Sequence, residues 1–147
     1  MSNTTNEYLE EKIRKNNIDG ATIIKLFVPH IEIPKYMGLA DFAISPYKPV
    51  PSKLYGTPIK NGEYWAMGLP IVITPNISED SGIVKNNNVG AILNGFNKED
   101  YNKAIKEIDF IISGKNRREV YAMIRPLVEK YRNFSIAEKV YAAIYIS

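Results

Sequence analysis

The chain has 147 residues, of which 45% are hydrophobic and 24% are charged, which is typical of one globular domain and excludes disordered, collagen-like and coiled-coil architectures. Its formal net charge is +3, and basic and acidic residues alternate along the chain without a concentrated basic stripe, so we expect no nucleic-acid partner. The absence of cysteine and the single histidine, His30, exclude disulfides, thiol catalysis, cysteine-ligated zinc and multi-histidine metal centres.

The N-terminus and the apolar runs carry no targeting signal. Residues 1–6 are polar, without the apolar region of a secretory signal, and no run approaches about eighteen apolar residues, the length of a membrane span. We therefore expect a soluble, cytoplasmic protein. The small excess of positive charge is compatible with peripheral contact at the anionic inner face of a membrane. No residue pattern requires a metal or another cofactor.

The first half of the chain predicts strands that alternate with helices. Apolar residues at helical spacing predict a short helix over residues 7–16. The β-branched apolar run ATIIKLFV, residues 21–28, is typical of a buried strand. Pro34 suits the first turn of a short helix, and residues 41–45 (DFAIS) form a second strand that Pro46 closes.

The middle of the chain begins with a long loop. Residues 47–62 are rich in proline and poor in apolar side chains, and loops of this length are usually functional. A short helix follows from Gly62 or Glu63, and residues 70–74 (PIVIT) form the third strand. A helix over residues 78–85 leads into the fourth strand, residues 89–93 (VGAIL).

The last third of the chain predicts three helices. Asn97 is a suitable N-cap for the first, and the basic cluster at residues 115–118 is interpreted as the solvated start of the second. Pro126 should kink or break that second helix. Ser135 and Glu138 have the spacing of a capping box for the final helix.

Together these elements predict an α/β fold: a Rossmann-like open parallel sheet of about four strands, flanked by helices, in one domain over residues 1–147. Sheets of this kind bind ligands at the carboxyl ends of their strands. Here those ends are followed by the loops after Val28, Ser45, Thr74 and Leu93, and the long loop is one of them.

The stretch SKLYGTPIKNGEYWAMGLP, residues 52–70, carries the most specific chemistry. A glycine- and proline-containing loop that enters a helix offers unpaired backbone N–H groups and a positive dipole end, which suit a phosphate or diphosphate. Glu63, expected at or near the first turn, can accept hydrogen bonds from two neighbouring hydroxyls, such as those of a ribose. The alternative is an ordinary first-turn acid that the helix dipole favours.

This stretch resembles the C-terminal, nucleotide-sugar-binding domain of the GT-B fold glycosyltransferases, closest to glycosyltransferase family four, the group one type. The family motif is E-G-x-P, a second glutamate eight positions after the first, and an A-x-G-x-P-V turn into a strand. The matching residues are Gly56, Pro58, Glu63, Ala66, Gly68 and Pro70. The segment LADFAISPY precedes this stretch in the same order as in the family, and GIV, VGAIL and NFSIAEKVYAAIY follow it, so the resemblance extends from about Glu7 to the C-terminus.

The resemblance implies that Glu63 binds the donor ribose. Tyr55 stands where the family has its first glutamate, which contacts the transferred sugar, and its ring either stacks on a sugar or base or is an ordinary loop tyrosine. Lys60 fits a shorter family form with a lysine three positions before the glutamate, and is otherwise a solvated loop lysine. The predicted substrate-binding residues are Tyr55, Gly56, Thr57, Lys60, Gly62 and Glu63, and no catalytic residue is assigned.

The resemblance also implies an incomplete enzyme. Relative to the family, the N-terminal acceptor domain and the first two strands of the C-terminal domain are missing, which would leave a sheet edge open to self-association. One hypothesis is a domain that binds a UDP- or GDP-sugar for transfer to a saccharide or lipid-linked acceptor, as in polysaccharide biosynthesis, and that is inactive without an N-terminal domain or partner chain. The alternative is a non-catalytic donor-binding or interaction module.

Overall fold

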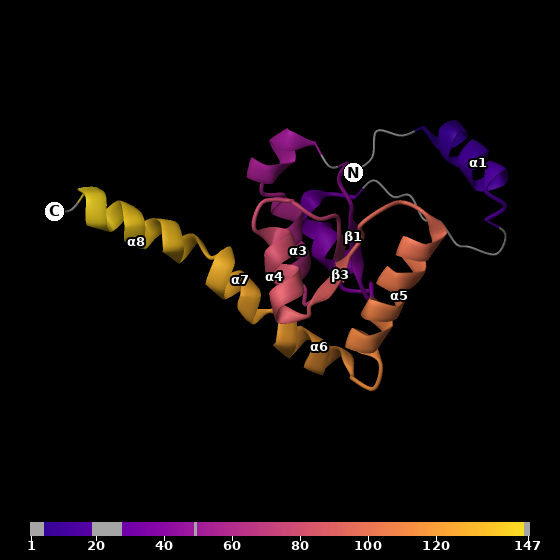
Figure 1. The fold of residues 1–147 in the computed structure, drawn as a ribbon. Helices are drawn as coiled ribbons and strands as arrows, with labels where there is room; N and C mark the ends of the chain where they lie inside the picture. Colours follow the sequence, from indigo (N-terminus) through magenta and orange to yellow (C-terminus); the bar gives the residue numbers. More distant parts are fainter. Residues whose placement is uncertain (1–4, 19–27, 49, 146–147) are drawn as a thin grey trace. The chain divides into compact units, whose positions relative to one another are not determined.

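The computed structural model describes residues 5–18, 28–48 and 50–145, and contacts within the chain divide it into two units, Met1–Ile33 and Pro34–Ser147 (Figure 1). In the first unit, the predicted N-terminal helix is confirmed as α1 (Asn6–Lys15), which begins where the Thr5 hydroxyl accepts a hydrogen bond from the backbone N–H of Tyr8. The strand predicted at residues 21–28 lies outside the described residues, except for Val28, which is not in a strand.

The second unit is built on a parallel sheet in the order β1-β2-β3. The strands are β1 (Ala43–Ser45), β2 (Ile71–Ile73) and β3 (Gly90–Ile92), and their register aligns Ala43 with Ile71 and Ile71 with Gly90. The described sheet therefore has three of the roughly four expected strands, each shorter than its apolar run. The predicted α/β class, with an open and incomplete Rossmann-like parallel sheet, is confirmed.

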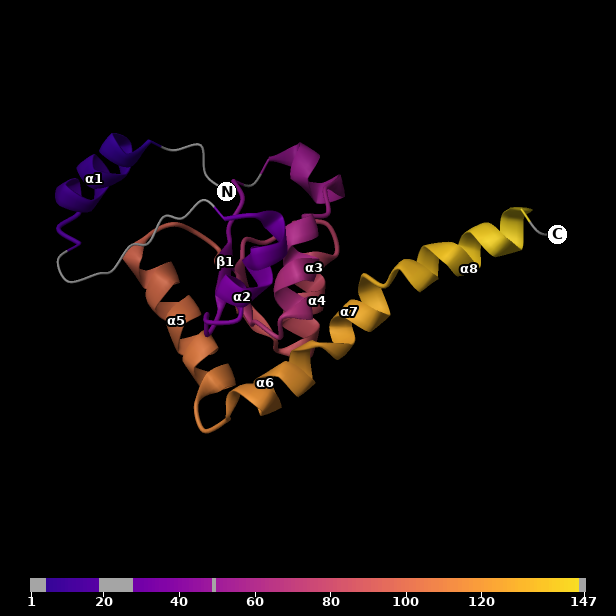
Figure 2. The ribbon, with the colours of Figure 1, turned by 180° about the vertical axis from the view of Figure 1, so that it is seen from behind.

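Helices cover both faces of this sheet (Figures 1 and 2). The helices of this unit that pack around the sheet are α2 (Ile33–Met37), α3 (Ile59–Ala66), α4 (Asp80–Asn87), α5 (Lys98–Ile112), α6 (Arg117–Ile124) and α7 (Pro126–Tyr131). The last helix, α8 (Phe134–Tyr145), extends away from the sheet and has no buried residue (Figures 1 and 2). On one face, Trp65 of α3, Val84 of α4 and Ile124 of α6 pack with Ile71 and Ile73 of β2. On the other face, α5 covers the central and outer strands with Ala104, Ile108 and Ile111 against Val72, Ala91 and Leu93.

Helix ends are largely as the sequence predicts. Asn97 caps α5, since its side-chain oxygen accepts a hydrogen bond from the Asp100 N–H at 2.9 Å, and Asn116 forms a capping box with Glu119 at the start of α6. Pro126 is the first residue of α7, which confirms the predicted break. The expected cap at Ser135 is wrong, because Asn133 accepts the Ser135 N–H and α8 has already begun at Phe134.

The segment expected to be a loop over residues 47–62 contains helical structure. A 3-10 helix, η2 (Pro51–Tyr55), lies within it, and α3 begins at Ile59, three residues before the earliest start that the sequence predicts. Pro58 supplies an extended residue ahead of the first turn, and buried Asn61 is held by a tertiary hydrogen bond. Glu63 is consequently in the second turn of α3, which corrects its expected place near the first turn.

Gly68 lies just after the end of α3. It follows the C-cap residue Met67 and adopts a left-handed φ of 69°, which glycine tolerates without strain. A Cβ at this position would lie 2.6 Å from the Cα of Tyr121 in α6. Glycine here therefore both terminates the helix and allows the chain to pass α6 closely before it enters β2.

Candidate functional site

The loops that follow β1 and β2 are joined at the carboxyl ends of these strands. The Thr74 hydroxyl accepts a hydrogen bond from the backbone N–H of Tyr47 at 3.0 Å and donates one to the carbonyl oxygen of the same residue at 2.8 Å. Farther along the same loops, the hydroxyls of Thr57 and Ser78 are hydrogen-bonded at 3.2 Å. The turn before α3 is thereby fixed against the loop after β2, at the edge of the sheet where ligands of open α/β folds bind.

The loop after β2 holds two non-glycine residues in the left-handed region. Asn76 has φ 59° and Ser78 has φ 44°. Each such conformation costs about 1–3 kcal/mol, and conformations of this kind cluster at functional sites. The sequence gives only a weak signal of this loop, since asparagine tolerates the left-handed region better than most residues.

Glu63 lies on the exposed face of α3. The buried residues of this helix are Asn61 and Trp65, two positions to either side, which at 100° per residue places Glu63 opposite them. Lys60, one turn earlier, is exposed on the same side. No described side chain forms a hydrogen bond or ion pair with the Glu63 carboxylate, which is therefore accessible to a ligand.

The other predicted site residues lie in two places. Tyr55 ends η2 with 89% of its surface exposed, and Gly56 and Thr57 continue from it towards α3. Gly62 is on a different side of α3, where a Cβ would lie 3.4 Å from the Cγ of Arg132. The structure thus brings residues 55–60 into one exposed turn, whereas Gly62 contacts the side chain that follows α7.

A buried polar network lies beneath the exposed face of α3. Asp80, at the start of α4, is fully buried and accepts a hydrogen bond from the Asn61 side-chain amide at 2.7 Å. The guanidinium of Arg132 forms a close ion pair with the same carboxylate, and its other terminal nitrogen lies 2.8 Å from Glu79. Burial raises the pKa of the Asp80 carboxyl above its ordinary value, while the hydrogen bond from Asn61 and the charge of Arg132 oppose that rise.

The same arginine also contacts the core. Its guanidinium lies 5.7 Å from the ring centroid of Trp65, which is a fully buried core residue. This network therefore ties α3 to α4 and to the end of α7. Sequence reasoning missed it, because Asp80 and Arg132 are 52 residues apart and no local pattern indicates that they meet.

The described residues contain no group of three or more acidic or histidine side chains that could hold a metal ion. In the same part of the chain, no helix is long and apolar enough to cross a bilayer. The polar groups that the turn before α3 and the joined loops offer to a ligand include the Glu63 carboxylate, the Lys60 ammonium, the hydroxyls of Thr57 and Ser78 and the backbone N–H groups at the start of α3.

Comparison with protein families matches residues 2–122 to the family described as glycosyl transferases group 1. Comparisons with curated proteins and with solved structures gave no significant match. The family match includes the turn before α3, Glu63 and all three described strands, and it covers more than half of the chain. This confirms the resemblance found in the sequence motif, and the chain therefore belongs to the group 1 glycosyltransferase family.

Proposed function

We propose that this chain binds the nucleotide-diphosphate sugar of a glycosyl transfer reaction at the turn formed by residues 55–60 and the exposed face of α3. Its membership of a glycosyltransferase family supports glycosyl transfer as the general activity. The observation that carries the proposal is the accessible Glu63 carboxylate, one helical turn from Lys60, beside the loops that the Thr57–Ser78 hydrogen bond joins.

In this proposal, the donor diphosphate binds at the N-terminus of α3. The N–H groups of Ile59 and Lys60 have no partner within the helix, and the dipole of the helix and the lysine ammonium add positive charge. Glu63 accepts hydrogen bonds from two neighbouring hydroxyls of the donor ribose. The chain thereby orients the donor and stabilises the negative charge that develops on the departing diphosphate.

Transfer also needs an acceptor, and we propose that a partner domain or partner chain supplies its binding surface. No residue of α8 is buried, although the helix is rich in apolar side chains. Those exposed by more than two fifths are Phe134, Ile136, Val140, Tyr141, Ile144 and Tyr145. An apolar surface of this kind is typical of an interface. The lone chain would then bind its donor without transferring the sugar, and the acceptor would be a saccharide or a lipid-linked sugar.

Calorimetric titration of the full chain with UDP, GDP and their glucose and mannose conjugates tests the donor proposal. We expect saturable binding of one of these nucleotides, which Glu63→Gln weakens about 10- to 100-fold, since a hydrogen bond to a charged group contributes about 1.5–3 kcal/mol. Glu138→Gln, an exposed glutamate of α8, is the matched control and should leave binding unchanged. Binding that is equal in both variants would refute the role of Glu63.

A non-catalytic module is the second candidate function, and Tyr55 is the observation that favours it. A phenol replaces the carboxylate with which the family contacts the transferred sugar, and it is 89% exposed. If no nucleotide binds in the titration and none raises the melting temperature of the chain, the module is favoured over the donor-binding domain.

A further inference from the structure

A cavity of about 800 Å³ runs along the outer edge of β3, between α4 on one face of the sheet and α5 on the other. Gly90, Ile92 and Asn94 form its floor, and Val84 of α4 and Ile111 of α5 belong to its walls. It is separate from the turn before α3, none of whose residues contributes to it. We refer to this cavity as the edge groove.

The floor of the edge groove consists of unpaired strand backbone. β3 pairs with β2 through alternate residues, as shown by the Leu93 N–H, which donates to the Ile73 carbonyl oxygen at 2.8 Å. The N–H and C=O groups of the intervening residues, Gly90 and Ile92, therefore point to the opposite edge. Within the described part of the chain, no strand pairs with that edge. The residues with open hydrogen-bonding groups are thus the ones that line the cavity.

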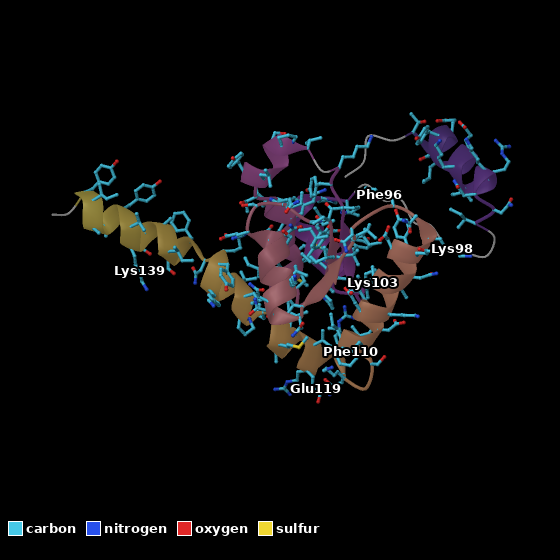
Figure 3. The ribbon with its side chains drawn as sticks, viewed as in Figure 1. Phe96, Lys98, Lys103, Phe110, Glu119 and Lys139 are labelled. Atoms are coloured by element: carbon cyan, nitrogen blue, oxygen red, sulfur yellow. The ribbon has the colours of Figure 1, made fainter. Side chains whose placement is uncertain are left out.

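The walls of the edge groove are positively charged. Lys85 of α4 and Lys103 and Lys106 of α5 line it, against one acidic side chain, Glu107, which leaves an excess of two positive charges. Phe110 adds an apolar surface that is 84% exposed. Figure 3 labels Lys103 and Phe110, about two turns apart along α5. A ligand of this groove should therefore combine negative charge, some apolar surface and backbone hydrogen-bonding groups.

We propose that the edge groove binds an extended, acidic segment of another protein, which joins the sheet as an additional strand next to β3. Strand addition satisfies the open N–H and C=O groups of Gly90 and Ile92, and its side chains alternate between the two walls. Acidic side chains then meet Lys85 on one wall and Lys103 on the other, and an apolar one contacts Phe110. The backbone gives affinity, and the lysines select an acidic sequence.

A second copy of this chain fits the edge groove less well. Pairing of two β3 edges about a two-fold axis would place the same surface of each copy against the other. Lysines on both copies would then face each other, and like charges across a strand pair are destabilising. Charge complementarity thus favours a different, acidic chain as the occupant.

The test uses the full chain and a fluorescein-labelled, end-blocked nonapeptide that repeats the order Asp-Asp-Val-Val, which places acidic and apolar side chains on both faces of an added strand. We expect saturable binding by fluorescence anisotropy, and no binding of the matching peptide in which lysine replaces every aspartate. In the complex, hydrogen exchange of the Ile92 amide followed by NMR should slow at least tenfold, because that N–H gains a strand partner. A bound anion without a backbone would not protect this amide.

Charge reversal provides the second measurement. The double variant Lys103→Glu with Lys106→Glu should weaken peptide binding at least tenfold. The matched control is Lys98→Glu with Lys139→Glu, which changes the net charge equally at two exposed lysines that do not line the groove (Figure 3). The control should bind as the unmodified chain does.

Three outcomes would overturn the proposal. The first is equal peptide affinity in the two double variants. The second is an Ile92 amide whose exchange does not slow when the peptide binds, together with binding of laurate or of anionic phosphatidylglycerol vesicles. That result would identify an amphiphilic anion or a lipid surface as the ligand. The third is protection of Ile92 without peptide in a chain that sediments as a dimer, which would identify a second copy as the occupant.

Discussion

Replacement of Arg132 by methionine tests the buried network under α3. Methionine keeps an apolar stem against Gly62 but removes the cation that pairs with Asp80. Asp80 is 0% exposed and would keep only its hydrogen bond from Asn61. A buried charge that loses its partner costs about 3–5 kcal/mol, so we expect Arg132→Met to lower the free energy of unfolding by this amount at neutral pH.

The loss should depend on pH, because Asp80 can escape the unpaired charge by binding a proton. Burial already raises its folded-state pKa above the ordinary 3.8, and removal of Arg132 raises it further. When the pKa of a carboxyl is higher in the folded state than in the unfolded state, the protonated carboxyl stabilises the fold. This stabilisation is fully present below the unfolded-state pKa and is lost as pH rises through the folded-state pKa. The difference between the variant and the unmodified chain should therefore widen from about pH 4 upwards.

Urea unfolding at pH 4.5 and pH 7.5, followed by the fluorescence of Trp65, measures both effects, because Trp65 is the single tryptophan and is fully buried. Arg118→Met, at an exposed arginine of α6, is the control and should change stability by no more than about 0.5 kcal/mol. A loss below about 1 kcal/mol for Arg132→Met at pH 7.5, or an equal loss at both pH values, would refute the assignment of Asp80 as a buried, ion-paired carboxylate.

Three further predictions concern stability. Gly68→Ala should destabilise the chain by more than about 1 kcal/mol in urea unfolding, because the φ of Gly68 is 69° and a Cβ would meet the α6 backbone. Gly82→Ala should instead stabilise the chain by about 0.5–1 kcal/mol, because Gly82 lies in α4 with open space around it. Thr74→Val removes both hydrogen bonds to the Tyr47 backbone and should cost about 1–3 kcal/mol in the same assay; an unchanged midpoint would contradict the link between the two loops. Asn116→Ala removes the α6 capping box and should lower the melting temperature, at a cost of about 0.5–2 kcal/mol.

The strands and most helix ends were predictable because their determinants are local. Short apolar runs closed by proline or polar residues predicted β1, β2 and β3, and Asn97 and Pro126 marked a helix start and a helix break by their own chemistry. The start of α3 was not predictable in this way. Its first turn has the composition of a loop, and its buried residue, Asn61, is held by a hydrogen bond to a residue 19 positions away.

In the candidate site, too, the residues of a local motif were predictable and those that depend on tertiary contacts were not. Glu63 was predicted from a motif, and its exposed position is compatible with the role that the motif implies. The Thr57–Ser78 contact and the left-handed backbone of Asn76 arise where two loops meet, and neither loop specifies that meeting by itself. The sequence therefore predicted the residues that belong to one motif, and it did not predict those that act through tertiary contacts.

The two faces of α3 link these observations. The exposed face presents Glu63, and the opposite face carries Asn61 and Trp65, which contact Asp80 and Arg132. Arg132 lies beyond residue 122, where the family match ends, so a segment outside the match fixes the helix that carries the family motif. A ligand carboxylate is effective only when its helix is held in place, because small displacements of a positioned group weaken its contacts steeply. Under the proposed function, loss of the Glu63 carboxylate should thus remove a donor contact without loosening the fold, whereas loss of the Arg132 cation should loosen α3 and displace an otherwise intact Glu63.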